Sequence, residues 1–184
     1  MLKVLGSFFA GVIVVALVGW QMMPKMMFSE IESPYGFEET IARIQHNVED
    51  NPELKAKGWA LVGLRNVAKA VQNDGGNVLP AMMVEICSTK YSAPILKDDD
   101  LRILSILMPC KISVYKKQDG KVYIGTMNAG LMGMMFGPLV SEVMGEVAKD
   151  QQRFLVFDPK LPAPQMILPK AGPAGGAGGG GGGC

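Results

Sequence analysis

The sequence predicts an α+β domain, with helices packed on a small mixed sheet as a two-layer sandwich, preceded by one transmembrane helix. Three observations support this fold. Strand-like alternating segments are interleaved with segments of helical periodicity. One β-hairpin is explicit, and an uncharged apolar run opens the chain. The 184 residues fit one domain, and the net charge of +1 without a basic patch indicates no nucleic-acid partner.

The apolar run covers residues 4–23 and contains no charge and one amide, Gln21. A helix rises ~1.5 Å per residue, so this length matches the ~30 Å hydrocarbon core of a bilayer. Trp20 lies near one end, where an aromatic ring favours the headgroup region. The alternative is a cleavable signal peptide, which has a shorter apolar region of ~7–15 residues and a small-x-small cleavage site. We expect residues 4–23 to stay attached and to contact membrane lipid as a single-pass anchor.

The charges that flank this run predict its orientation. Lys3 and the α-amino group precede it, whereas Lys25, Glu30 and Glu32 follow it. The positive-inside rule then predicts that the domain lies on the extracytoplasmic (periplasmic) side.

The domain is expected over residues 26–157. Residues 28–32 alternate apolar and polar, as in a half-buried strand. From Phe37 to Val48, apolar residues recur at spacings typical of an amphipathic helix, with Glu38 and Glu39 in its first turn. The next expected elements are a strand over 58–63, a helix over 66–72 and a strand over 79–87.

The second half of the domain contains the clearest local signal. Residues 110–115 and 121–126 both alternate and flank a turn at 118–120, which predicts a β-hairpin. Before it, the helical spacing of residues 91–107 is interrupted by the charged run 97–100, so we expect two helical pieces. After the hairpin we expect a helix over 131–149 and a last strand over 153–157.

Three short motifs resemble the family named domain of unknown function 302. They are YGFEET at residues 35–40, MPCKISVY at 108–115 and MNAGLMG at 127–133. The resemblance covers about residues 26–157. It implies a compact α+β sandwich that tends to pair as a homodimer, and it implies no established reaction. It also implies a bacterial or archaeal setting, sometimes near sulfur or redox functions.

Two candidate thiols lie within this domain. Cys87 ends one expected strand, and Cys110 begins another at the family-like Pro-Cys motif. They are either small apolar core residues, a disulfide in an oxidising compartment, or a reactive thiol or ligand. Their wide separation lacks the Cys-x-x-Cys spacing of redox or metal sites. His46 is the only histidine and lies off the apolar face of its helix, so we expect it to be solvated.

Methionine and glycine are concentrated just after the hairpin. Thioethers suit soft metals or a haem axial position, and glycines permit close approach of a ligand or helix. The alternative is ordinary core packing by adaptable methionines. The candidate ligand or interface residues are Met127, Asn128, Gly130, Met132, Gly133 and Gly137. The identity of any metal or cofactor stays open.

Residues 159–184 are rich in proline and glycine and end in Cys184. Such a segment cannot bury enough apolar surface to fold by itself, so we expect a disordered tail, natural or engineered.

No P-loop, Gly-x-Gly-x-x-Gly or Gly-x-Ser-x-Gly motif occurs, so the sequence favours a protein that is not an enzyme. The leading hypothesis is a membrane-anchored accessory or ligand-binding module that is a subunit or partner in a membrane-associated assembly. One alternative is a thiol- or sulfur-handling redox protein that uses Cys110 and Cys87. A second alternative is soft-metal or haem binding through the Met/Gly-rich run.

Overall fold

The computed structural model describes residues 11, 13–14, 17, 19–21 and 25–167. Within them, five strands form one sheet in the order β1-β5-β4-β3-β2. The strands are β1 (Phe28–Glu32), β2 (Trp59–Asn66), β3 (Ala81–Ser88), β4 (Cys110–Lys116) and β5 (Val122–Met127). This order confirms the α+β class and the hairpin, which is the β4–β5 pair.

The expectation of a mixed sheet is wrong, because every pairing among these strands is antiparallel. Two strands that a helical crossover joins form a parallel pair only where they are neighbours in the sheet. Here the helical crossover after β1 leads to β2, and these two strands lie at opposite edges of the sheet.

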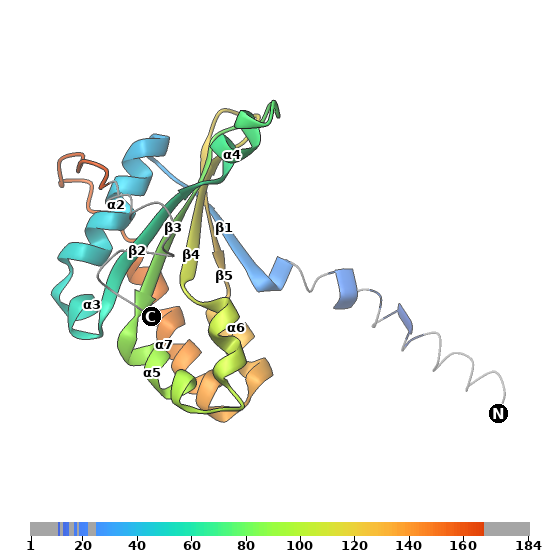
Figure 1. Cartoon of the computed structure of the whole chain (residues 1–184). Helices are drawn as coiled ribbons and strands as arrows, with labels where there is room; N and C mark the ends of the chain where they lie inside the picture. The colour runs from blue at the N-terminus through green and yellow to red at the C-terminus, as the bar shows by residue number, and fades with distance from the viewer. Residues whose placement is uncertain (1–10, 12, 15–16, 18, 22–24, 168–184) are drawn as a thin grey trace.

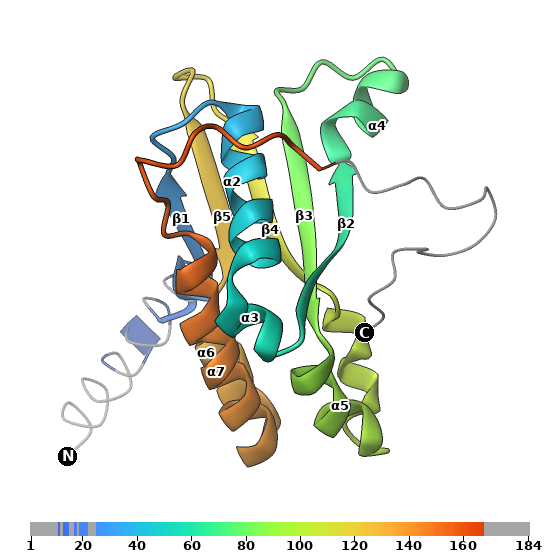
Figure 2. The same ribbon diagram turned by 90° about the vertical axis from the view of Figure 1, so that its left-hand side faces the viewer.

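The helices cover one face of the sheet and extend one of its ends (Figures 1 and 2). Helices α2 and α7 lie across one face, and we call the opposite face the open face. It bears Lys111, Ser113 and Tyr115 of β4, which alternate with the buried Ile112 and Val114. We call the region of α5, η1, η2 and the start of α7 the helical end. The helical elements are α2 (Phe37–Asp50), α3 (Pro52–Ala56), α4 (Val67–Asn73), α5 (Thr89–Lys97), η1 (Arg102–Leu107), α6 (Ala129–Gly133), η2 (Met134–Phe136) and α7 (Pro138–Phe154).

The main core lies between the sheet and α2, as the sequence patterns predict. Alternate strand residues such as Val84, Ile112 and Ile124 point to this side and are buried. They meet Ile41 and Ile44 of α2, which are fully buried. The period of two in the strands and of about 3.6 in the helix therefore converge on one apolar layer.

The region after the hairpin differs from the expected single helix over 131–149. It forms α6, η2 and α7, with a break at Gly137, whose φ of 89° lies in the left-handed region that glycine favours. Pro138 then begins α7, a position where its missing N–H costs no helical hydrogen bond.

The last expected strand, over 153–157, is wrong. Arg153 and Phe154 form the end of α7. Phe154 continues the helical spacing of Val143 and Val147, and its fully buried ring packs edge-on against Trp59 at 5.0 Å. The helical period, rather than the short apolar run, determines the structure here.

The expected disordered tail begins too early at residue 159, because residues 159–167 pack on α2. The buried Arg43 side chain donates hydrogen bonds to the carbonyls of Asp158 and Leu161 at 3.0 and 2.9 Å. The fully buried Gln45 amide pairs with the backbone of Ile167 in both directions. Buried polar groups need such partners, and here the following segment of chain supplies them. Residues 168–184 lie outside the described part.

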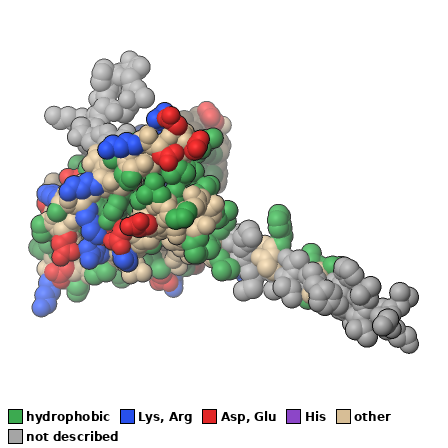
Figure 3. Space-filling view, turned by 90° about the horizontal axis from the view of Figure 1, so that it is seen from below, with side chains coloured by type: hydrophobic (Ala, Val, Ile, Leu, Met, Phe, Trp, Pro, Cys, Tyr) green, Lys and Arg blue, Asp and Glu red, His purple; other side chains and the backbone are tan. Residues whose placement is uncertain are grey.

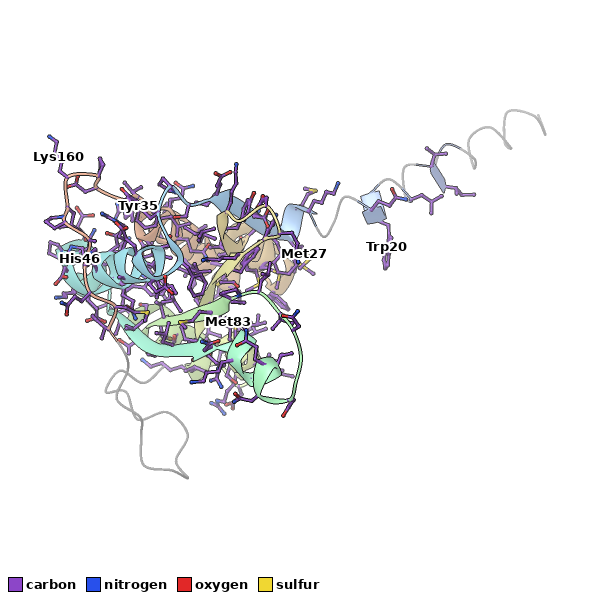
Figure 4. The ribbon with its side chains drawn as sticks, turned by 90° about the horizontal axis from the view of Figure 1, so that it is seen from above. Trp20, Met27, Tyr35, His46, Met83 and Lys160 are labelled. Atoms are coloured by element: carbon purple, nitrogen blue, oxygen red, sulfur yellow. The ribbon has the colours of Figure 1, made fainter. Side chains whose placement is uncertain are left out.

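The expected anchor over 4–23 falls largely outside the described residues. Among the residues that are described, no helix is long and apolar enough to cross a membrane. Ile13, Val14, Leu17 and Trp20 are exposed. Trp20 stands apart from the domain, which the chain joins at Met27 (Figure 4).

Candidate functional site

A cavity of about 60 Å³ lies at the helical end, beneath the ends of β3 and β4. Its walls come from the sheet and from α5, η1, α6, η2 and α7. The lining residues are Trp59, Cys87, Ser88, Tyr91, Ser92, Ile95, Leu104, Leu107, Met108, Cys110, Met127, Met132, Phe136, Val140, Val143, Met144 and Val147.

Four of the residues singled out in the sequence meet in this cavity: Cys87, Cys110, Met127 and Met132. Met108 and Met144 add two further thioethers. The cavity is therefore rich in sulfur as well as apolar. Thioether side chains are flexible and polarisable, so they adapt to occupants of different shape.

The two cavity cysteines differ chemically. Cys110 is a free thiol at the start of β4, opposite Ile86 of β3. Burial raises the pKa of the Cys110 thiol, and the nearby Lys111 charge lowers it by less. Cys87 takes part in a disulfide, so these two cysteines are not bonded to each other. A protonated buried thiol is a poor nucleophile, because the thiolate is the reactive form.

A buried carboxylate stands behind the aromatic wall of the cavity. Asp150 of α7 is fully buried and accepts hydrogen bonds from Trp59 Nε1 at 2.9 Å, the Tyr91 hydroxyl at 3.1 Å and Lys57 Nζ at 2.7 Å. The hydrogen bond to Asp150 raises the pKa of Lys57, and burial raises the pKa of Tyr91. Both side chains keep their protons and hold Asp150 in place.

The polar groups around the cavity are bonded within the protein. The Ser92 hydroxyl donates to the Ser88 carbonyl at 2.8 Å, and the Tyr91 hydroxyl donates to Asp150. Across the described residues, no buried side-chain nitrogen or oxygen lacks a hydrogen-bond partner. The cavity therefore presents carbon and sulfur to an occupant.

The other four candidates from the Met/Gly-rich run serve the backbone. Asn128 caps α6 by accepting from Leu131 N–H at 3.1 Å, and its amide donates to the Met26 carbonyl at 3.1 Å. Gly130, Gly133 and Gly137 do not line the cavity. Gly133 is buried where α6 crosses α7.

Sequence patterns missed the aromatic and acidic part of the site. Trp59 reads as an ordinary strand residue and Tyr91 as an ordinary helical residue, and Asp150 lies just after the helix expected over 131–149. No spacing relates the three positions, because three separate elements bring them together. His46 pairs with Asp50 through Nδ1 and Oδ2 at 2.6 Å on the outer side of α2, away from the cavity (Figure 4).

Comparison with known proteins identifies relatives of the domain but no activity. A family model described as "Domain of unknown function DUF302" matches residues 29–156. The fold is similar to the crystal structure of an uncharacterised conserved protein DUF302 from Bacillus stearothermophilus, with a TM-score of 0.59 and 24% identity. That similarity covers 71% of this chain and 96% of the other. No curated protein matches the chain significantly.

Proposed function

Since this chain belongs to the DUF302 family, whose name specifies no reaction, we propose its function from the cavity: a membrane-anchored accessory module that binds a small apolar ligand. The match over residues 29–156 confirms the resemblance to this family, which the sequence motifs placed over about residues 26–157.

The observation that carries the proposal is the sulfur-rich apolar cavity, whose surrounding polar groups are already paired. An apolar cavity of ~150 Å³ holds benzene or xenon and excludes water, because water would lose hydrogen bonds there. The cavity here, at about 60 Å³, suits a ligand of few heavy atoms. Movement of Met132 or Met144 would enlarge it for a bigger ligand, since neither side chain is branched.

The two alternatives have weaker support. A thiol-based reaction at Cys110 needs a thiolate, and burial raises the pKa of this thiol. Haem is a large, planar group, and a cavity of about 60 Å³ would have to be rebuilt to hold it. A soft metal such as Cu(I) fits the sulfur ligands better, and metal analysis of the purified native protein tests that alternative.

The membrane anchor rests on residues 4–23 of the sequence. We expect the full chain to stay in the membrane fraction after a carbonate wash. A mature protein that begins near Lys25 by mass spectrometry would contradict a retained anchor. The extracytoplasmic orientation and pairing as a homodimer remain predictions, which protease accessibility in intact cells and light scattering in detergent can test.

Xenon is a suitable probe of the cavity, because it is apolar and small. We expect xenon to shift the methyl NMR signals of Met132 and Met144 saturably in the full chain labelled with ¹³C-methyl methionine. Met83 is the internal control, because it lies outside the cavity on the middle of β3 (Figure 4). Unchanged signals, or equal shifts at Met83, would contradict a ligand-binding cavity.

A further inference from the structure

The helical end exposes large apolar side chains to solvent. Ile103 and Ile106 of η1 are 75% and 80% exposed, and Met134 and Met135 of η2 are each 65% exposed. Phe28, the first residue of β1, is 63% exposed. Hydrophobic atoms cover much of the molecule when it is viewed from this end (Figure 3). Such a concentration of exposed apolar side chains is typical of an interaction surface rather than of a freely solvated one.

The fold holds these side chains outward. In η1, Leu104 is buried in a small core with Val140 and Val143, so its neighbours Ile103 and Ile106 must face away from that core. In η2, Phe136 packs on the same small core, whereas Met134 and Met135 do not. In each short 3-10 helix, one residue packs against the small core and its neighbours are exposed to solvent.

The chain itself indicates what covers this surface. The apolar run ends at residue 23, and Phe28 follows five residues later. Extended chain spans at most ~3.3–3.6 Å per residue, so Phe28 lies within roughly 17 Å of the end of that run. Asn128, next to α6, holds this junction through hydrogen bonds with the Met26 and Met27 carbonyls at 3.1 and 2.8 Å. Phe28 and Ile106 also line one groove on the open face.

We propose that Phe28, Ile103, Ile106, Met134 and Met135 seat in the interfacial layer of the bilayer that holds the anchor. The inference rests on the proposed anchor over 4–23. The acidic run Asp98–Asp100 lies beside η1, so apolar insertion rather than attraction to anionic lipid drives the contact. Leu107 and Met127 line both the groove and the cavity, which places the cavity next to the membrane surface.

Depth-dependent quenching of tryptophan by brominated lipid tests the contact. The full chain is reconstituted into phosphatidylcholine vesicles with brominated acyl chains. Native Trp20 reports on the anchor: its quenching is the difference in fluorescence quenching between the native chain and the Trp20→Phe variant. In the Trp20→Phe background, Ile106→Trp and Met135→Trp report the proposed surface. Val71→Trp on α4 is the matched control, because Val71 is also exposed but lies at the opposite end of the domain (Figure 1).

We expect Ile106→Trp and Met135→Trp to be quenched several-fold more than Val71→Trp, with unchanged circular dichroism. Quenching of Trp20 without quenching of Ile106→Trp would overturn the docking surface and leave the anchor intact. Quenching of Ile106→Trp without quenching of Trp20 would support the surface and contradict the anchor. Unquenched reporters together with a doubled mass in light scattering would assign the surface to a second copy and overturn the proposal.

Discussion

The crossing of α6 over α7 offers a sharp test of the packing at the candidate site. A Cβ added at Gly133 would lie 2.5 Å from Met144 Cβ and 3.0 Å from the Val140 carbonyl oxygen. Neither atom can rotate away, so the helices must separate, and such overpacking costs ~1–3 kcal/mol. Alanine also favours a helix over glycine by ~0.5–1 kcal/mol. We therefore expect Gly133→Ala to lower the free energy of unfolding by ~1–2 kcal/mol net.

Gly130 is the matched control in the same helix. Its added Cβ would meet Ala148 Cβ at 3.8 Å, which is an ordinary contact. Gly130→Ala should therefore raise stability by up to ~0.5–1 kcal/mol, through helix propensity alone.

Urea unfolding of the full chain in detergent, followed by far-ultraviolet circular dichroism, measures both variants. The helix term cancels in their difference, which leaves the packing cost. Equal stability changes for Gly130→Ala and Gly133→Ala would refute the close helix crossing. A destabilised Gly133→Ala that also loses the xenon shifts at Met144 would link this crossing to the cavity.

Three further outcomes are expected from the buried and exposed polar groups. Asp150→Ala should destabilise the fold by about 3 kcal/mol in urea unfolding, because it leaves buried hydrogen-bond donors without an acceptor. Glu146→Ala, on the exposed side of α7, is the control and should change the stability little. Similar losses of stability in the two variants would contradict this role of Asp150. Burial, together with the hydrogen bond to Glu30, raises the pKa of Tyr115 from 10.0 to about 12. The contribution of Tyr115 to the free energy of unfolding is therefore complete below pH 10 and is lost as the pH rises through 12. Tyr115→Phe should remove the latest step in a tyrosinate absorbance titration, and an unchanged titration would refute the assignment. Cys110 should react with iodoacetamide at pH 8 more slowly in the native than in the unfolded protein, because burial raises its thiol pKa, and equal rates would show an accessible thiol.

Local sequence patterns predicted the elements in which apolar residues recur with the period of a strand or a helix. The hairpin over β4 and β5 and the helix α2 follow from alternation and from helical spacing, and both are confirmed. The short apolar run over 153–157 led to the wrong prediction of a strand, because Phe154 fits both a strand pattern and the helical period of α7. The break at Gly137 was missed, because helical spacing continues on both sides of it. The prediction of a site in the Met/Gly-rich run was correct for only some of its residues: Met127 and Met132 line the cavity, whereas the glycines do not.

The sequence by itself determined the α+β class, the methionine- and glycine-rich run after the hairpin and the uncharged run that precedes the domain, because each depends on residues close together in the chain. Only the tertiary structure decided the antiparallel strand order, the site of Asp150 behind Trp59, and the ordering of residues 159–167 by Arg43 and Gln45. These features depend on which distant surfaces meet. That choice is made by the burial of one continuous apolar layer and by the need of every buried polar group for a partner. The periods in the sequence show which residues are buried, but they do not show which distant strand or helix each of them meets.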